Sequence, residues 1–289
     1  MGRFSHVRNL LRATGSAFAT LALFAAGATG ATSATSAWAV PSAASAPAAA
    51  RGAVVYDALG DSYASGYGVP PYDGSCGRSE AAYAEQLNGR MRVHLDNFVA
   101  CAVATTTTLV TGGQLDALDS DTDLVTLTIG GNDIGWSSAV VACLGGTDPD
   151  CAAAVATTRS NITTKLPALL DSVYRQVAEH APNARVVVTG YPRLFSPFHG
   201  TYLGASTPEQ RALNEGANVL NRVIAKAAQK HGFTFVDVTN RFKGHGVNAP
   251  NPWILGPFDP AAFHPTLPGY RAYTAAIASS LRHCPPRGY

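Results

Sequence analysis

The sequence predicts an α/β fold in which helices cover both faces of a parallel sheet. Five short apolar runs typical of strands occur at residues 54–59, 98–103, 124–129, 185–189 and 233–238. Longer segments compatible with helices separate most of these runs, and this alternation is typical of parallel sheets. Turn-forming residues directly follow three of the strands, at residues 60–62, 130–133 and 190–192. Such a sheet carries its site at the carboxyl ends of the strands, so we expect function at that edge.

The chain begins with a segment that is typical of a secretory signal peptide. Residues 1–39 contain three arginines and no acidic residue, then an apolar stretch over about residues 17–28, then Ala-Trp-Ala at 37–39. The apolar stretch is shorter than the ~20 residues that a membrane span needs. We therefore expect export, cleavage near Ala39 and no stable membrane anchor.

The rest of the chain is predicted to be one domain behind a short linker. Residues 40–52 consist almost entirely of Ala, Pro and Ser, which bury too little apolar surface to offset the entropy of ordering, so we expect a flexible lead-in. Residues 53–289 show no internal repeat and have a length common for one α/β domain.

Charge and residue patterns exclude two classes of partner. The signal segment holds three of the 21 Lys and Arg residues, so the mature chain keeps 18 against 19 Asp and Glu. This balance leaves no basic field for nucleic acid. The chain has no Cys-x-x-Cys, no His-Glu-x-x-His and no tight histidine cluster. We therefore predict no metal site and no cofactor, and we expect a monomer.

Three helices are predicted by apolar residues at spacings of three and four. The best delimited begins at Thr207, where Thr-Pro-Glu-Gln forms a capping-box pattern with Pro208 at the first helical position, and stops at Gly232. Residues 161–181 and 270–281 show a similar apolar stripe. These helices are interpreted as scaffold.

Five cysteines in an exported chain favour disulfides, because an oxidising compartment preserves them. The spacing leaves the pairing open. The odd number leaves one thiol over, and Cys284 near the C-terminus is the natural candidate.

Ser62 and His264 are the candidate nucleophile and base. Ser62 ends a Gly-Asp-Ser sequence directly after the first strand, and His264 lies in Phe-His-Pro near the other end of the chain. A serine hydroxyl needs a base to take its proton, and neutral imidazole is the usual one. The alternative is that Gly-Asp-Ser is an ordinary turn. Among the other histidines, His245 ranks a distant second, because Pro265 and Pro268 stiffen the backbone around His264.

Asn132 is the candidate donor to a developing negative charge. Gly130 and Gly131 follow the third strand and permit close approach of the backbone, and the Asn132 side chain supplies an amide. Acyl transfer needs fixed N–H groups where the carbonyl oxygen becomes an oxyanion. The alternative is again a turn. Asp133 is expected to brace this loop.

Three motifs together resemble those of the SGNH (GDSL) hydrolases: Gly-Asp-Ser-Tyr-Ala-Ser-Gly at 60–66, Gly-Gly-Asn-Asp at 130–133 and Phe-His-Pro at 263–265. The resemblance spans nearly all of the mature chain and is closest to the secreted actinobacterial lipases, esterases and phospholipases A1. It implies a flavodoxin-like three-layer α/β/α sandwich with a mainly five-stranded parallel sheet. It also implies that Ser62 is the nucleophile, His264 the base, and the Asn132 side chain and the Ser62 N–H the oxyanion hole.

The chain departs from the family pattern at two positions. Val103 stands where the family has a glycine whose N–H completes the oxyanion hole; the donor survives, but valine adopts positive φ at a cost. Ala261 stands where many members have an aspartate three residues before the histidine, and Asp259 lies five before it. By resemblance to the actinobacterial branch, a main-chain carbonyl of Ala261 or Ala262 is expected to orient His264, with Asp259 as the alternative.

The resemblance further implies two disulfides, Cys76 with Cys101 and Cys143 with Cys151. Large apolar residues near the predicted site are expected to line an acyl pocket, with ordinary core packing as the alternative. These residues are Trp136, Phe195, Phe198, Trp253, Ile254 and Leu255.

The sequence therefore predicts a secreted, cofactor-free lipase or esterase that hydrolyses fatty acyl esters through a Ser-His acyl-enzyme mechanism, with acylglycerols as the expected substrates. The alternatives are a phospholipase A1 or carbohydrate esterase on the same scaffold, because fold and catalytic residues do not select the leaving group. A binding module that has lost its chemistry is the alternative from another class.

Overall fold

Five parallel strands form the sheet of the computed structural model, which describes residues 52–283. Their order across the sheet is β2-β1-β3-β4-β5, the flavodoxin-like order. The strands are β1 (Val54–Gly60), β2 (Val93–Phe98), β3 (Leu124–Thr128), β4 (Arg185–Thr189) and β5 (Thr234–Val236). The predicted α/β class with a five-stranded parallel sheet is confirmed.

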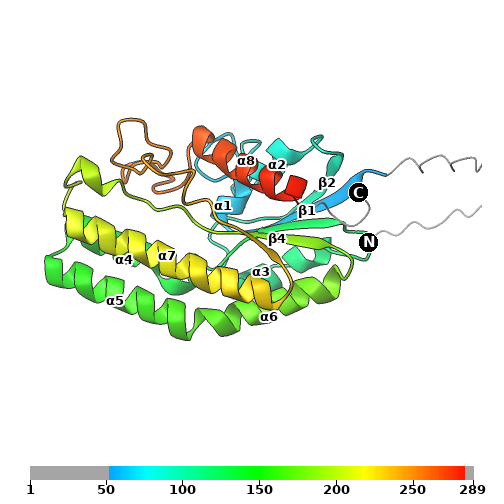
Figure 1. The fold of residues 1–289 in the computed structure, drawn as a ribbon, viewed down its shortest axis with the longest axis horizontal. Helices are drawn as coiled ribbons and strands as arrows, with labels where there is room; N and C mark the ends of the chain where they lie inside the picture. The colour runs from blue at the N-terminus through cyan, green and yellow to red at the C-terminus, as the bar shows by residue number, and fades with distance from the viewer. Residues whose placement is uncertain (1–51, 284–289) are drawn as a thin grey trace, which may run out of the picture. The chain divides into compact units, whose positions relative to one another are not determined.

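Helices cover both faces of this sheet, and a core lies on each face. Figure 1 shows α2 (Tyr83–Leu87) and α8 (Leu267–His283) on one side of the strands, and α6 (Leu166–His180) and α7 (Thr207–Lys230) on the other. The short α3 (Thr106–Thr111) packs against α6. The result is the three-layer arrangement that the sequence predicted.

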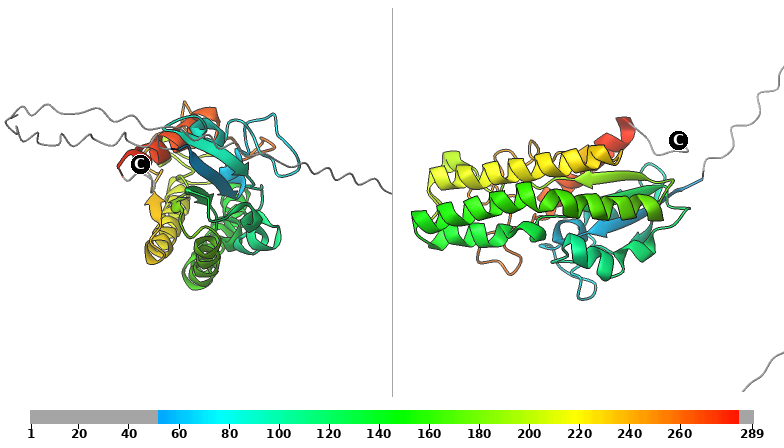
Figure 2. Two further views of the ribbon diagram at one scale, coloured as in Figure 1. Left: turned by 90° about the vertical axis from the view of Figure 1, so that its right-hand side faces the viewer. Right: turned by 90° about the horizontal axis from the view of Figure 1, so that it is seen from below.

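Two helices extend the molecule beyond the sheet. These are α4 (Trp136–Gly145) and α5 (Asp148–Thr164), and α5 packs against α7. The second view in Figure 2 shows α5 and α7 side by side, running on past the strands. The carboxyl edge of the sheet therefore has a helical wall on one side. The four-residue helix α1 (Ser62–Ser65) and the short 3-10 helices η1 (Gln114–Ala117), η2 (Asn132–Ile134) and η3 (Pro197–His199) complete the helices and strands of the described residues.

The second strand lies earlier in the chain than predicted. Residues 99–103 of the predicted run follow the strand, and β2 is Val93–Phe98. Because β2 pairs only with β1 and forms an edge of the sheet, only its first residue is fully buried, and its sequence Val-His-Leu-Asp-Asn-Phe has no continuous apolar run.

Two helix boundaries also differ from the prediction. The segment 161–181 is divided at Lys165, where α5 ends and α6 begins. Pro167 lies in the first turn of α6 and has no N–H with which to continue α5. The capping box of α7 is formed by Ser206 and Glu209, not by Thr207 and Gln210, because the Ser206 N–H donates to the Glu209 carboxylate over 2.8 Å.

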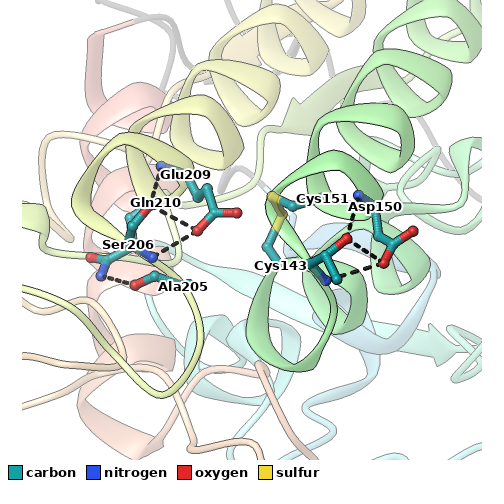
Figure 3. Close-up of a disulfide and its surroundings, with 8 residues drawn as sticks. Cys143, Asp150, Cys151, Ala205, Ser206, Glu209 and Gln210 are labelled. Carbon is teal, nitrogen blue, oxygen red and sulfur yellow. Dashed lines mark hydrogen bonds between the residues drawn. A yellow bond between two sulfur atoms is a disulfide. The ribbon is translucent and has the colours of Figure 1, made fainter.

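Both disulfides implied by the family resemblance are present, Cys76–Cys101 and Cys143–Cys151. Figure 3 shows that the second joins α4 to the first turn of α5, beside the capping boxes at Asp150 and at Ser206. The Cys143–Cys151 bond thus fixes the corner between the two helices that extend the wall. Cys284, the signal peptide and residues 40–51 of the lead-in lie outside the described residues.

Candidate active site

A tight turn after β1 presents Ser62 at the carboxyl edge of the sheet. Gly60 has φ +132°, and a Cβ at this position would collide with the Thr128 carbonyl oxygen, so only glycine fits. The Asp61 carboxylate accepts from the Tyr63 N–H at 2.9 Å and caps α1 (Ser62–Ser65). As the first residue of this helical turn, Ser62 has an N–H without a partner inside the helix.

His264 reaches Ser62 from the far end of the chain. Its Nε2 lies 2.8 Å from the Ser62 Oγ, although the two residues are 202 positions apart. Its Nδ1 lies 3.1 Å from each of the Ala261 and Ala262 carbonyl oxygens. A carbonyl only accepts, so these contacts place the proton on Nδ1 and leave Nε2 as the acceptor for the serine hydroxyl.

Asp259 stabilises the turn that precedes His264. Its Oδ1 accepts from the Ala261 N–H at 2.8 Å, and the Ala261 carbonyl in turn contacts His264. Burial of the imidazole lowers the pKa of His264 below 6.5, while the two carbonyl contacts and the Asp259 charge oppose this change. The ring is therefore neutral at neutral pH, as a general base must be.

Asn132 opens a 3-10 turn directly after β3 and lines the same cavity as Ser62. Its Nδ2 donates to the Ala104 carbonyl oxygen at 2.8 Å. A side-chain amide carries two N–H groups, so this bond fixes the amide and leaves a second donor. The Asp133 carboxylate accepts from the Thr106 hydroxyl at 2.6 Å and from its N–H, which braces the loop as expected.

Val103 has φ +62°, the conformation that glycine would adopt without strain. The preceding Ala102 N–H donates to the Cys76 carbonyl at 2.8 Å, so the disulfide-linked segment holds the turn. The Val103 N–H makes no hydrogen bond to any described residue. The side chain is 81% exposed and does not line the cavity that contains Ser62.

A buried contact between Asp61 and Tyr191 links the turn that contains Ser62 to the loop that contains Asn132. The Tyr191 hydroxyl donates to the Asp61 carboxylate and accepts from the Gly131 N–H at 3.0 Å. Burial raises the pKa of Asp61 to about 7, and the nearby Asp133 charge adds to this, whereas the bonds from Tyr191 and Tyr63 oppose it.

The cavity at Ser62 has a volume of about 630 Å³ and is mainly apolar. Of the predicted pocket residues, only Trp136 lines it. The walls come from α4, from α7 and from the loops before α7 and α8, and most of these residues were not predicted from the sequence. Besides Trp136, the apolar side chains of the lining include Val140, Val141, Leu144, Leu194, Leu203, Leu220, Phe258 and Phe263.

The other five predicted pocket residues lie elsewhere. Phe195 and Ile254 are buried in the core, and Trp253 stacks on His245 at a ring distance of 3.8 Å. Phe198 is exposed and contacts His199. Leu255 lies beside Gly68, and its backbone pairs with His264. Core packing, the alternative reading of these apolar residues, holds for Phe195 and Ile254. His245, the second candidate base, makes no hydrogen bond to Ser62 or Asn132; its Nδ1 contacts the Asn251 carbonyl at 2.8 Å.

Within residues 52–283, no three His, Cys, Asp or Glu residues gather in a way that would hold a metal ion. No helix in this range combines the length and the apolar character needed to cross a membrane.

Comparisons with known proteins agree with this geometry. Residues 58–272 match the model of the GDSL-like Lipase/Acylhydrolase family. Lipase 1 of Streptomyces coelicolor is 38% identical over 233 residues, which cover 77% of this chain and 84% of that protein.

Two solved structures are similar over their whole length. The crystal structure of an extracellular lipase from Streptomyces rimosus has 39% identity and a TM-score of 0.75, and the match covers 78% of this chain and 99% of that one. The crystal structure of a phospholipase A1 from Streptomyces albidoflavus has 38% identity and a TM-score of 0.74 with the same coverage. The chain therefore belongs to the GDSL-like Lipase/Acylhydrolase family and is a carboxylic ester hydrolase.

Proposed function

We propose that this protein is a secreted lipase or esterase in which Ser62 and His264 hydrolyse fatty acyl esters through an acyl-enzyme. The contact that carries the proposal is the 2.8 Å approach of His264 Nε2 to Ser62 Oγ in the lining of a mainly apolar cavity. An apolar cavity of this volume suits an acyl chain.

The chemistry follows from these positions. His264 Nε2 takes the Ser62 proton while Oγ bonds to the ester carbonyl carbon, and the alcohol leaves with the proton from Nε2. Water then attacks the acyl-enzyme, gives its proton to Nε2, and releases the acid as Oγ regains the proton. The Asn132 amide and the N–H groups of Ser62 and Val103 are the proposed donors to the oxyanion.

The orientation of His264 is proposed to depend on main-chain carbonyls. The Ala261 and Ala262 carbonyl oxygens each lie 3.1 Å from Nδ1 and accept its proton's hydrogen bond, while Asp259 acts one step away through the Ala261 N–H. A carbonyl fixes the tautomer but stabilises the imidazolium less than a carboxylate would, because it lacks a full charge.

Export is part of the proposal. It is supported by the signal-like residues 1–39, by the two disulfides, and by similarity to the extracellular lipase of Streptomyces rimosus. The N-terminal sequence of the protein recovered from culture medium tests it. We expect a start close to Val40.

A fluorophosphonate tests the mechanism, because it labels only an activated serine. The wild-type protein should be labelled at Ser62, whereas Ser62→Ala and His264→Ala should not be labelled and should lose ester hydrolysis while remaining folded. Their losses should not add in the double mutant, since the two residues act as a unit. More than about a hundredth of wild-type turnover in Ser62→Ala contradicts the assignment.

A phospholipase A1 activity is the second candidate, favoured by the 38% identity to the Streptomyces albidoflavus enzyme. Rates on p-nitrophenyl esters, triacylglycerols, phosphatidylcholine and acetylated xylan separate the alternatives. The apolar lining predicts long acyl esters over acetylated sugars. A preference for acetylated xylan would contradict the proposed lipid substrate.

A further inference from the structure

Three large apolar side chains that line the cavity also project from the surface. Val141 is 67% exposed, Leu203 51% and Phe258 88%. They belong to α4, to the loop before α7 and to the loop before α8. We call these three residues the apolar rim. Single exposed apolar residues are ordinary, but several that border one cavity mark an interaction site.

The segments that supply the rim carry no full charge. Residues 134–147, 194–208 and 244–258 contain no Asp, Glu, Lys or Arg, although these types make up 14% of the whole chain. Asp259, which directly follows Phe258, accepts a hydrogen bond from the Ala261 N–H with its carboxylate. A partner of this surface would gain little from charge pairing, so its attraction must come mainly from burial of apolar groups.

The position of the rim separates a lipid surface from a protein partner. Val141, Leu203 and Phe258 border the same cavity that contains Ser62 and His264. A protein covering the rim would close the way to Ser62. A lipid monolayer would cover the rim and at the same time supply an acyl ester to the cavity.

We propose that the apolar rim inserts into the surface of aggregated, uncharged lipid, with Phe258 as the main anchor. The proposal rests on the proposed lipid substrate and deepens it. The rim holds the mouth of the cavity against the lipid, so that an acyl chain passes from one apolar environment to another without crossing water. Adsorption then depends on packing and hardly on ionic strength.

Binding to vesicles tests this without any turnover. Protein carrying Ser62→Ala is sedimented with vesicles of phosphatidylcholine, which has no net charge. We expect binding that changes less than about twofold as salt rises from about 10 to 500 mM. Adding Phe258→Ser should weaken binding about tenfold or more, because the phenyl ring no longer enters the lipid.

Fluorescence locates the inserting residue. In a Phe258→Trp variant of the same protein, we expect a blue shift of the emission on addition of vesicles and quenching by brominated phosphatidylcholine, measured against the unsubstituted background. An unchanged spectrum in vesicle-bound protein would overturn Phe258 as the anchor.

Phe198→Ser is the matched control, since Phe198 is 71% exposed but does not line the cavity. It should weaken vesicle binding less than about threefold. An equal loss in both variants would overturn the assignment to the rim. Absence of vesicle binding would overturn the proposal and leave a protein as the partner of this surface. Fluorophosphonate labelling of wild-type protein is independent of vesicles, so failure of the proposed function is recognised separately.

Discussion

The Tyr63 hydroxyl donates to the Phe263 carbonyl oxygen across 2.6 Å. This bond joins the residue after the proposed nucleophile to the residue before the proposed base. Phe263 has φ +65°, an uncommon conformation for a bulky residue, and its N–H donates to the Leu255 carbonyl at 3.1 Å. Such a conformation persists only where the surroundings impose it. We therefore expect Tyr63 to hold His264 in position relative to Ser62.

Tyr63→Phe removes only the hydroxyl, and we expect turnover to fall about tenfold to a hundredfold with little change in KM, because the base moves relative to Ser62. Tyr56→Phe is the control, since it removes another buried hydroxyl bond, the 2.6 Å contact with Thr126 Oγ1. Kinetics and urea unfolding of both variants separate positioning from stability. Equal losses of turnover in the two variants would leave Tyr63 with a structural role only.

Asp259→Asn should cost less than about tenfold in turnover, because the asparagine retains an oxygen for the Ala261 N–H and no carboxylate is needed at Nδ1. Steady-state kinetics of the folded variant check this. A loss on the order of a thousandfold would instead show that Asp259 acts as the third member of a triad.

Asn132→Ala should lower turnover ~10² to 10³-fold with a small effect on KM, because the amide is expected to donate chiefly to the transition state. Kinetics on a soluble p-nitrophenyl ester measure both constants. If only KM changes, Asn132 binds the ground state and has no part in the oxyanion hole.

Val103→Gly should raise the free energy of unfolding by about 1 kcal/mol, since glycine adopts φ +62° without the strain that a β-branched residue suffers. Turnover should change little, because the N–H at this position is retained. Urea denaturation measures the gain. Val103→Ala, which keeps a Cβ, should gain less stability. A Val103→Gly variant that is less stable than the wild type would show that Val103 is not strained.

The pH dependence of the stability of Asp61→Asn tests whether burial raises the pKa of the Asp61 carboxyl group. The pKa of Asp61 is about 7 in the folded protein and about 3.9 when unfolded, so the folded state binds the proton more tightly. This group therefore makes the protein less stable as pH rises from about 4 to about 7. Urea unfolding across this range should show a smaller loss of stability in Asp61→Asn than in the wild type. Identical pH dependence would place the pKa of Asp61 near its ordinary value.

The sequence predicted what is contiguous in the chain and missed what the fold assembles. Ser62, Asn132 and His264 each follow from a short motif, and the parallel sheet explains why the first two lie at one edge. The sequence predicted β2 too far along the chain, because this edge strand has no continuous apolar run. The division at Lys165 was missed because the apolar stripe continues through it, whereas Pro167 decides the boundary.

The cavity could not be predicted because its walls come from separate segments. Apolar residues of the same types pack in the core at Ile254, line the cavity at Leu194 and lie on the surface at Phe198, and sequence spacing does not distinguish these environments. Only Trp136, which follows the Asn132 loop directly, was close enough to a motif to be placed.

The separation of 202 positions between Ser62 and His264 also determines when the site forms. The loop that brings the two ends together costs entropy, which must be offset by the packing of α8 and its preceding turn onto the sheet. During synthesis, Ser62 leaves the ribosome long before His264, its proposed base. On the proposed mechanism, a nascent chain or a chain truncated before His264 has no base for Ser62, and we expect it to leave the lipids of the producing cell intact.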